Sequence, residues 1–137
     1  MYIIGIGVDI IEIGRIRAAC LNRSSFITRI FTAAEREYAF KKSSPWQHLA
    51  ARFAAKEAVA KSLGRSFSWQ EVEIIGRAGT MPVVRLHGRA KEIAAELKVS
   101  EIKLSLSHSR QYAVAQALSL GGVDIESSFG SGDAQHR

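Results

Sequence analysis

The hydrophobic pattern opens with a strict alternation over residues 2–9, the period of two that is typical of a half-buried strand. One face of this strand carries Tyr2, Ile4, Ile6 and Val8. The other face carries Ile3, Gly5, Gly7 and Asp9. Because glycine has no side chain, we expect this second face to be open and to end at the Asp9 carboxylate.

Helical spacing replaces the alternation after this strand. Apolar residues fall on one stripe at Ile13, Ile16, Cys20 and Leu21. Arg15 and Arg17 lie away from that stripe, which predicts a helix with a basic outer side. The capping-box pair Thr32 and Glu35 predicts a second helix, which ends at the breaking residues 43–45.

The strongest helix propensity in the chain belongs to an alanine-rich run over residues 46–63. Gly64 follows it, where a helix terminator is expected. Two short β-type runs at 71–75 and 83–86 predict a hairpin. The remaining patterns predict a helix near residues 90–97 and strands over 102–107 and 111–118.

This order of elements defines the fold class. Helices mixed with hairpins favour an α+β domain with a small antiparallel sheet packed with helices. We assign residues 1–118 to one domain, which is long enough to bury a core. Residues 119–137 are rich in Gly and Ser and lack periodicity, so we expect a mobile C-terminal tail.

Composition narrows the expected environment. The single cysteine, Cys20, excludes an internal disulfide framework and agrees with a reducing compartment, so we expect a cytoplasmic protein. The apolar start of the chain lacks a basic leader and reaches Asp9 and Glu12 too early for a signal peptide or membrane span. We therefore expect no membrane association.

The charge balance favours an anionic partner. Nineteen Lys and Arg against thirteen Asp and Glu give a net charge of +6, which suits a nucleic acid, a nucleotide cofactor or an acidic protein. Basic residues are not interleaved with aromatic ones as in single-strand binders, so nucleic acid is disfavoured. Zinc and P-loop motifs are absent from the sequence, and GIGVD has too few glycines for a dinucleotide fingerprint.

Four residues are candidates for chemistry, each with a structural alternative. Asp9 could approach a ligand from the glycine face, or could cap the following helix together with Glu12. Glu57 and Lys61, four residues apart, could border a site or form an ordinary exposed ion pair. His108 ends a strand beside Ser107 and could donate hydrogen bonds to phosphate, or could be structural.

Two further basic residues of the same helix, Arg52 and Lys56, form a separate stripe that could be solvated charge alone. Taken one at a time, these residues leave the function open. Their order along the chain is more informative.

Three segments, taken together, resemble the holo-acyl-carrier-protein synthase family. They are IGIGVDIIEIGRI at 4–16, ARFAAKEAVAKSLG at 51–64 and LSLSHSRQYAVA at 104–115. The resemblance implies the 4'-phosphopantetheinyl transferase fold and a homotrimer with active sites at subunit interfaces. It also implies transfer of the 4'-phosphopantetheine group from coenzyme A to a serine of an apo-acyl carrier protein, with adenosine 3',5'-bisphosphate as the second product.

The resemblance also implies residue roles. Asp9 and Glu57 are the expected Mg²⁺ ligands, and these two residues and Lys61 are the expected catalytic groups. Phosphates of coenzyme A are expected to bind Arg52, Lys61, Ser107 and His108. Mg²⁺ suits this set, since it prefers one or two carboxylates together with substrate phosphate and water.

Carrier proteins of this system are acidic, so the resemblance implies docking on Arg15, Arg17 and Arg23. Two segments depart from the family pattern: RSFSW replaces a longer Gly-rich loop after Gly64, and GTMP replaces a GKP-like turn. Because of these departures, the resemblance does not assign the residues that contact the adenosine of coenzyme A. A binding module for coenzyme A without catalysis and a basic nucleic-acid-binding domain are the competing hypotheses.

Overall fold

The structure, a computed structural model, describes residues 1–76 and 80–122. Its helices are α1 (Ile13–Asn22), α2 (Ser24–Ile30), α3 (Ala33–Phe40), α4 (Pro45–Leu63), the 3₁₀ turn η1 (Trp69–Glu71) and α5 (Gly88–Glu96). Its strands are β1 (Tyr2–Glu12), β2 (Val72–Ile75), β3 (Val83–Leu86), β4 (Val99–His108) and β5 (Tyr112–Gly121). The predicted α+β class is confirmed, and solved relatives described below share the fold.

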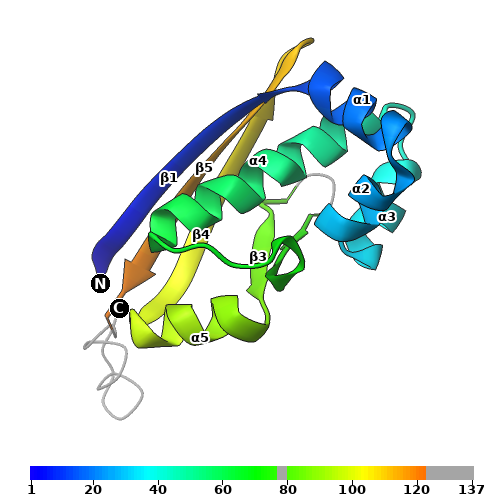
Figure 1. Cartoon of the computed structure of the whole chain (residues 1–137). Helices are drawn as coiled ribbons and strands as arrows, with labels where there is room; N and C mark the ends of the chain where they lie inside the picture. The colour runs from blue at the N-terminus through cyan, green and yellow to red at the C-terminus, as the bar shows by residue number, and fades with distance from the viewer. Residues whose placement is uncertain (77–79, 123–137) are drawn as a thin grey trace.

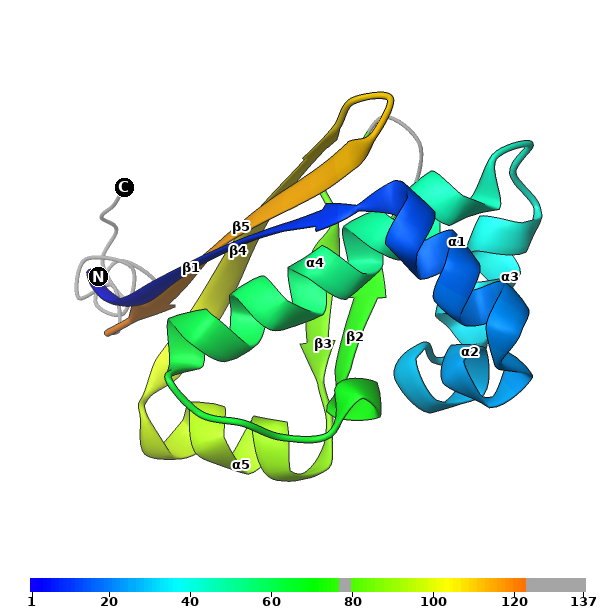
Figure 2. The ribbon, with the colours of Figure 1, turned by 45° about the horizontal axis from the view of Figure 1, so that its top comes forward.

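Two antiparallel sheets surround the long helix α4. The larger sheet has the order β1-β5-β4, and α4 lies along one of its faces (Figure 1). The smaller sheet is the hairpin β2-β3, which lies with α5 on another side of α4 (Figure 2). Helices α1, α2 and α3 gather beside the N-terminal part of α4. Helix α4 is therefore the central element of the domain.

The glycine face of β1 is not open, contrary to the sequence-based expectation. A Cβ atom built on Gly5 would lie 1.9 Å from the Ser62 carbonyl oxygen, and one on Gly7 would lie 1.9 Å from the Ala58 carbonyl oxygen. The two glycines therefore let the backbone of β1 come into direct contact with α4. This close approach brings the strand residue Asp9 to the helix.

The capping alternative for Asp9 is also wrong. Strand β1 continues past Asp9 to Glu12, and Glu12 occupies the N-cap position of α1 without a side-chain capping hydrogen bond. Asp9 pairs with Ala115 of β5, and both side chains face α4. The Asp9 carboxylate therefore does not occupy the capping position of α1.

Along β1, no described residue of the single chain covers the other sheet face. Ile6, Val8 and Ile10 of β1 point away from α4 and are 56%, 55% and 61% exposed. Their direct partners on β5 include Val114 and Leu118. We call this apolar surface the outer sheet face.

Local sequence signals explain several element ends. The capping box of Thr32 and Glu35 starts α3 as predicted, and Gly64 ends α4 in the left-handed conformation at φ 69°. The predicted hairpin is β2-β3. Helix α2 and the turn η1 were not predicted, because both are too short for a periodic pattern.

The C-terminal strand is longer than predicted. β5 continues through Gly121, three residues past the predicted boundary at 118, and Ser119 and Leu120 are buried. The rest of the predicted tail, residues 123–137, lies outside the described residues. Among the described residues, no helix is long and apolar enough to cross a membrane.

Candidate active site

Asp9, Glu57 and Lys61 lie together where β1 crosses α4. The Lys61 ammonium donates to the Val8 carbonyl oxygen at 3.0 Å and to Asp9 Oδ1 at 3.3 Å. Lys61 is 56% exposed in its side chain and Asp9 is 19% exposed, so the pair borders solvent. Glu57 precedes Lys61 by one helical turn and projects on the same side of α4.

The electrostatics of this cluster suit a cation. Burial raises the pKa of Glu57, the charge of Asp9 raises it further, and Lys61 acts in the opposite direction. The like charges of Glu57 and Asp9 are, after burial, the second cause of the raised pKa of Glu57. A bound cation would relieve this repulsion, and two hard oxygen donors beside open solvent fit Mg²⁺.

The described residues hold no cluster of three or more His, Cys, Asp or Glu that could hold a metal. Mg²⁺ does not require such a cage, because it retains water and binds substrate phosphates. Asp9 and Glu57 are therefore a sufficient protein contribution. Their role as ligands stays a prediction.

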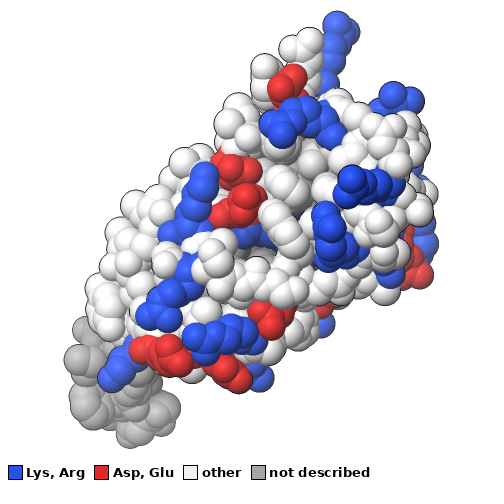
Figure 3. All heavy atoms as spheres, viewed as in Figure 1, with Lys and Arg blue, Asp and Glu red and all other residues white. Residues whose placement is uncertain are grey.

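A groove runs along the same side of α4. It has a volume of about 510 Å³ and is lined by Glu57, Ala60, Lys61, Gly64, Arg65 and Ser66. Figure 3 shows this side of the molecule, with acidic side chains over α4 between basic ones. Arg65, which sequence reasoning missed, places a second cation in the groove and pairs loosely with Glu96 at 3.8 Å.

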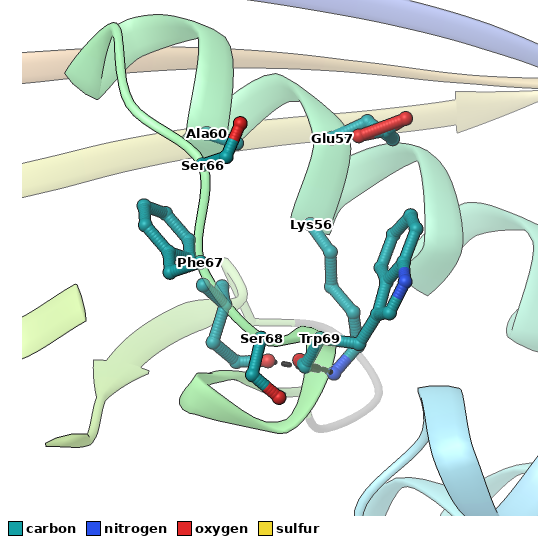
Figure 4. Close-up of a pocket in the computed structure, with 8 residues that line it drawn as sticks. Lys56, Glu57, Ala60, Ser66, Phe67, Ser68 and Trp69 are labelled. Carbon is teal, nitrogen blue, oxygen red and sulfur yellow. Dashed lines mark hydrogen bonds between the residues drawn. The ribbon is translucent and has the colours of Figure 1, made fainter. Parts of the chain in front are cut away.

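A smaller cavity continues from the groove and is drawn in Figure 4. It shares Glu57, Ala60 and Ser66 with the groove and has a volume of about 180 Å³. Its further lining residues are Lys56, Phe67, Ser68, Trp69 and Val72. We call it the Glu57 cavity.

Lys56 is not solvated charge, contrary to one interpretation of the sequence. Its ammonium lies 2.8 Å from Glu35 Oε1 and donates to the carbonyl oxygens of Trp69 at 2.9 Å and Val72 at 2.6 Å. The side chain is 1% exposed. Burial lowers the pKa of Lys56, and the charge and hydrogen bond of Glu35 act in the opposite direction.

Arg52 is also buried, so the same interpretation is wrong for it. Its guanidinium lies 4.2 Å from the centre of the Tyr38 ring, and its Nε has no hydrogen-bond partner among the described residues. Burial lowers the pKa of Arg52, while Tyr38 and Glu35 oppose the shift. A buried cation with an unused donor is suited to an anion.

Arg52 belongs to a second cavity, which we call the Arg52 cavity. Its volume is about 220 Å³, and Ser107 and His108 line it together with His48. Its other lining residues are Tyr38, Gln47, Ala51, Gly76, Thr80, Pro82 and Leu106. Burial lowers the pKa of His48, and the positive charges of Arg52, Lys42 and His108 lower it further. The cavity thus concentrates positive charge.

One chain does not bring all the predicted site residues together. Asp9, Glu57 and Lys61 form one group, whereas Arg52, Ser107 and His108 line a cavity that shares no residue with the groove. Arg52 and Glu57 are five positions apart on α4, so their side chains leave the helix about 140° apart. The two groups open on different sides of the domain.

The predicted docking residues are accessible. Arg15 and Arg17 are exposed on α1, and exposed Arg23 joins α1 to α2. Arg15 and Arg17 lie two positions apart and therefore on different sides of the helix. Their contact with a carrier protein stays a prediction.

The fold and the site define a class of protein. The chain belongs to the 4'-phosphopantetheinyl transferase superfamily, because a family profile of that description matches residues 5–117. The predicted family resemblance is confirmed.

Individual relatives agree with this membership. The holo-[acyl-carrier-protein] synthase of Caldanaerobacter subterraneus subsp. tengcongensis is 50% identical over 120 residues, which cover 85% of this chain and 94% of the relative. The crystal structure of holo-ACP-synthase from Plasmodium yoelii superposes with a TM-score of 0.79 at 34% identity, over 89% of this chain and 98% of that one.

A third relative is described with a ligand. The structure of a holo-(acyl-carrier-protein) synthase from Bacillus anthracis str. Ames is in complex with CoA (3',5'-ADP). It superposes with a TM-score of 0.72 at 31% identity, over 88% of this chain and 98% of that one.

Proposed function

We propose that this chain transfers the 4'-phosphopantetheine group from coenzyme A to a serine of an apo-acyl carrier protein in a Mg²⁺-dependent reaction. The observation that carries the proposal is the group of Asp9, Glu57 and Lys61 beside an open groove. The names of the relatives and the coenzyme A complex of one of them support the same reaction. The products are a holo-carrier protein and adenosine 3',5'-bisphosphate.

The residues of the groove divide the work of this reaction. The carrier serine oxygen attacks the phosphorus that carries the pantetheine arm, and the bond to the bridging pyrophosphate oxygen breaks. Either Glu57 or a water molecule on the bound Mg²⁺ would accept the serine proton, while Lys61 stabilises the negative charge of the departing bisphosphate. Asp9 and Glu57 would hold Mg²⁺, which supplies charge neutralisation on the pyrophosphate when bound.

The donor also requires the second group of residues. Arg52, with its unused Nε, and His108 suit a phosphate of coenzyme A, and Ser107 can add a hydroxyl. These residues open on a different side of the domain from Asp9, Glu57 and Lys61. We therefore propose that each active site is completed by a second copy of the chain.

The outer sheet face supports assembly into the homotrimer that the sequence predicts. Ile6, Val8 and Ile10 form a contiguous apolar surface, which monomeric proteins rarely leave exposed. We expect the mass of the native protein to be three times that of the chain. Val8→Lys should lower this mass while the chain remains folded; an unchanged mass would argue against the outer sheet face as the interface.

Shared sites have a stricter test. Asp9→Ala and His108→Ala should each lose transfer, because each variant damages one half of every site. Mixing and reassembling the two proteins should restore part of the activity, since some interfaces then combine two intact halves. Failure of the mixture to recover any activity, with mixed assemblies shown by native mass, would contradict shared sites.

Carrier docking and location follow from the same proposal. Exposed Arg15, Arg17 and Arg23 provide positive charge for an acidic carrier protein. The cytoplasm stays the predicted location, and the single cysteine, Cys20, is buried and unpaired as in proteins of reducing compartments.

The reaction is tested by the intact mass of a purified apo-acyl carrier protein after incubation with this protein, coenzyme A and Mg²⁺. We expect a gain of one phosphopantetheine, absent in chelator and absent with Asp9→Ala or Glu57→Ala that retain the fold. Full activity in both variants would refute the assigned roles. Coenzyme A binding without product would favour the binding module, and nucleic-acid binding that falls steeply with salt would favour the third hypothesis.

A further inference from the structure

Helix α2 follows the predicted docking residue Arg23 and contributes little to the core. Ser24 and Ser25 in its first turn are exposed, and within the helix only Ile30 at the C-terminal end is buried. A helix of this length is not stable on its own in water. Its direction is therefore set by the elements that it contacts, which are chiefly α1 and the turn η1 (Figure 2).

The C-terminal end of α2 is capped by a residue of η1. The last carbonyl groups of a helix have no partner within the helix and need donors from elsewhere. The side-chain amide nitrogen of Gln70 donates to the carbonyl oxygen of Thr28 and, at 3.0 Å, to that of Phe31. Both hydrogens of one amide group are thus used on the end of α2.

The turn η1 is itself anchored on the side of the domain that holds the candidate site. The Lys56 ammonium of α4 donates to the carbonyl oxygen of Trp69 at 2.9 Å. Glu71 accepts a hydrogen bond from the backbone N–H of Arg89 in α5 at 3.0 Å. Neither contact involves the Gln70 side chain, so η1 should stay in place when that side chain is changed.

A row of stacked rings makes a second connection between η1 and α2. Phe53 of α4 stacks on Trp69 of η1 with centroids 4.8 Å apart, and on Phe26 of α2 with centroids 6.4 Å apart. Phe26 lies in the first turn of α2, whereas Gln70 binds the last turn. Contacts that lead to η1 therefore hold α2 near both of its ends.

We propose that Gln70 is a positioning residue for the carrier protein, because it fixes the direction of α2 and with it the place of Arg23 relative to Glu57. This assignment rests on the proposed function. Gln70 is not among the residues that line the groove or the Glu57 cavity, so it acts through α2 and not on the donor. Loss of its amide should change how the carrier is held and leave the binding of coenzyme A unchanged.

Gln70→Met tests this role, since methionine has a similar length, lacks the amide donor and adds no charge near the basic surface. In transfer assays the variant should raise the KM for the carrier protein about fivefold, as expected when a net hydrogen bond is lost. The KM for coenzyme A and kcat should each change less than about twofold. Ser100→Ala is the matched control, because its hydroxyl donates to the carbonyl oxygens of Leu120 and Gly122 at the opposite end of the sheet, and it should change neither KM.

Hydrogen exchange in the protein without substrates shows whether the effect passes through α2. The backbone amides of residues 28–31 should exchange about fivefold faster in Gln70→Met, because the uncapped end of the helix opens more often. If their exchange is unchanged while the KM for the carrier rises, Gln70 contacts the carrier directly and the proposal is overturned. A rise in the KM for coenzyme A equal to that for the carrier would also overturn it, since η1 would then have moved as a whole.

Salt separates this role from a role of charge. The KM for the carrier should rise with salt at the same slope in Gln70→Met as in the parent protein, because no charge is altered. Arg23→Ala should reduce that slope. A reduced slope in Gln70→Met would contradict the proposal.

The same measurements distinguish this proposal from the proposed function. If no carrier gains mass with the parent protein, the transfer reaction is refuted, and the positioning role fails with it. If transfer proceeds and Gln70→Met alters neither the exchange of α2 nor the KM for the carrier, this proposal alone fails.

Discussion

The buried pair of Lys56 and Glu35 provides the sharpest test of how the site is held together. Lys56→Met keeps a side chain of similar length and removes the ammonium. Glu35, which is 1% exposed, would keep its backbone donors at Thr32 and Ile74 but lose its only direct ion-pair partner among the described residues. Arg52 would remain as a positive charge that acts on Glu35 without an ion-pair contact. Two carbonyl oxygens would also lose a donor.

The size of the effect follows from this environment. Removing one member of a buried ion pair leaves an uncompensated charge and typically costs about 3–5 kcal/mol. That cost is a large part of the about 5–15 kcal/mol by which a native domain is stable. The matched control is Lys103→Met, whose pair with Glu101 spans 3.2 Å with both side chains about half exposed. Its expected cost is about 0–1 kcal/mol.

Urea denaturation of the two variants measures both costs as free energies of unfolding. If Lys56→Met costs no more than Lys103→Met, the account of the buried pair is wrong.

Three further predictions follow from the packing and the titrating groups. Gly7→Ala should lower the free energy of unfolding by about 1–3 kcal/mol or more and reduce transfer, because its Cβ would lie 1.9 Å from the Ala58 carbonyl oxygen of α4. Gly14→Ala is the control, since a Cβ there meets nothing within 4 Å, and it should be neutral or stabilising in the same thermal denaturation. Burial alone would raise the pKa of Glu73, but hydrogen bonds, first that of His87, and nearby positive charges lower it below 4.5; the resulting stability is present above pH 4.5 and is lost as the pH falls through the folded pKa. Glu73→Gln should therefore flatten this acid limb of urea stability, and an unchanged slope would contradict the assignment. The pKa of His48 lies below 6.5 because of burial and then because of neighbouring positive charges. Adenosine 3',5'-bisphosphate bound in the Arg52 cavity should therefore raise the pKa of His48 and cause proton uptake. An NMR titration of His48 that is the same with and without the bisphosphate would exclude binding at that site.

Sequence reasoning succeeded where a local rule acts alone. The capping box of Thr32 and Glu35 satisfies its own backbone groups, so α3 starts where it was predicted. Gly64 ends α4 for an equally local reason, since its positive φ suits a residue without a Cβ atom. The spacing of Glu57 and Lys61 likewise placed both on one side of α4.

Sequence reasoning failed where the environment of a side chain depends on segments that are distant along the chain. Arg52 and Lys56 show the same charge pattern as any solvated helix stripe, yet Tyr38 covers one and Glu35 pairs with the other. Gly5 and Gly7 predicted an open face of the first strand, whereas in the fold they permit the backbone of β1 to contact α4. Helical and strand periods describe directions around one element and carry no information about which element packs there.

The sequence by itself determined the longer elements, their approximate limits and the family, because these depend on local propensity and on the order of short motifs. Tertiary structure alone decided that Asp9 reaches Lys61, 52 residues away, and that Arg52 and Glu57 open on different sides. It also decided that Phe67 and Trp69 form a cavity beside Glu57. The physical reason is that contacts between distant residues are fixed by the packing of whole elements, which at this site follows from two glycines that let β1 touch α4.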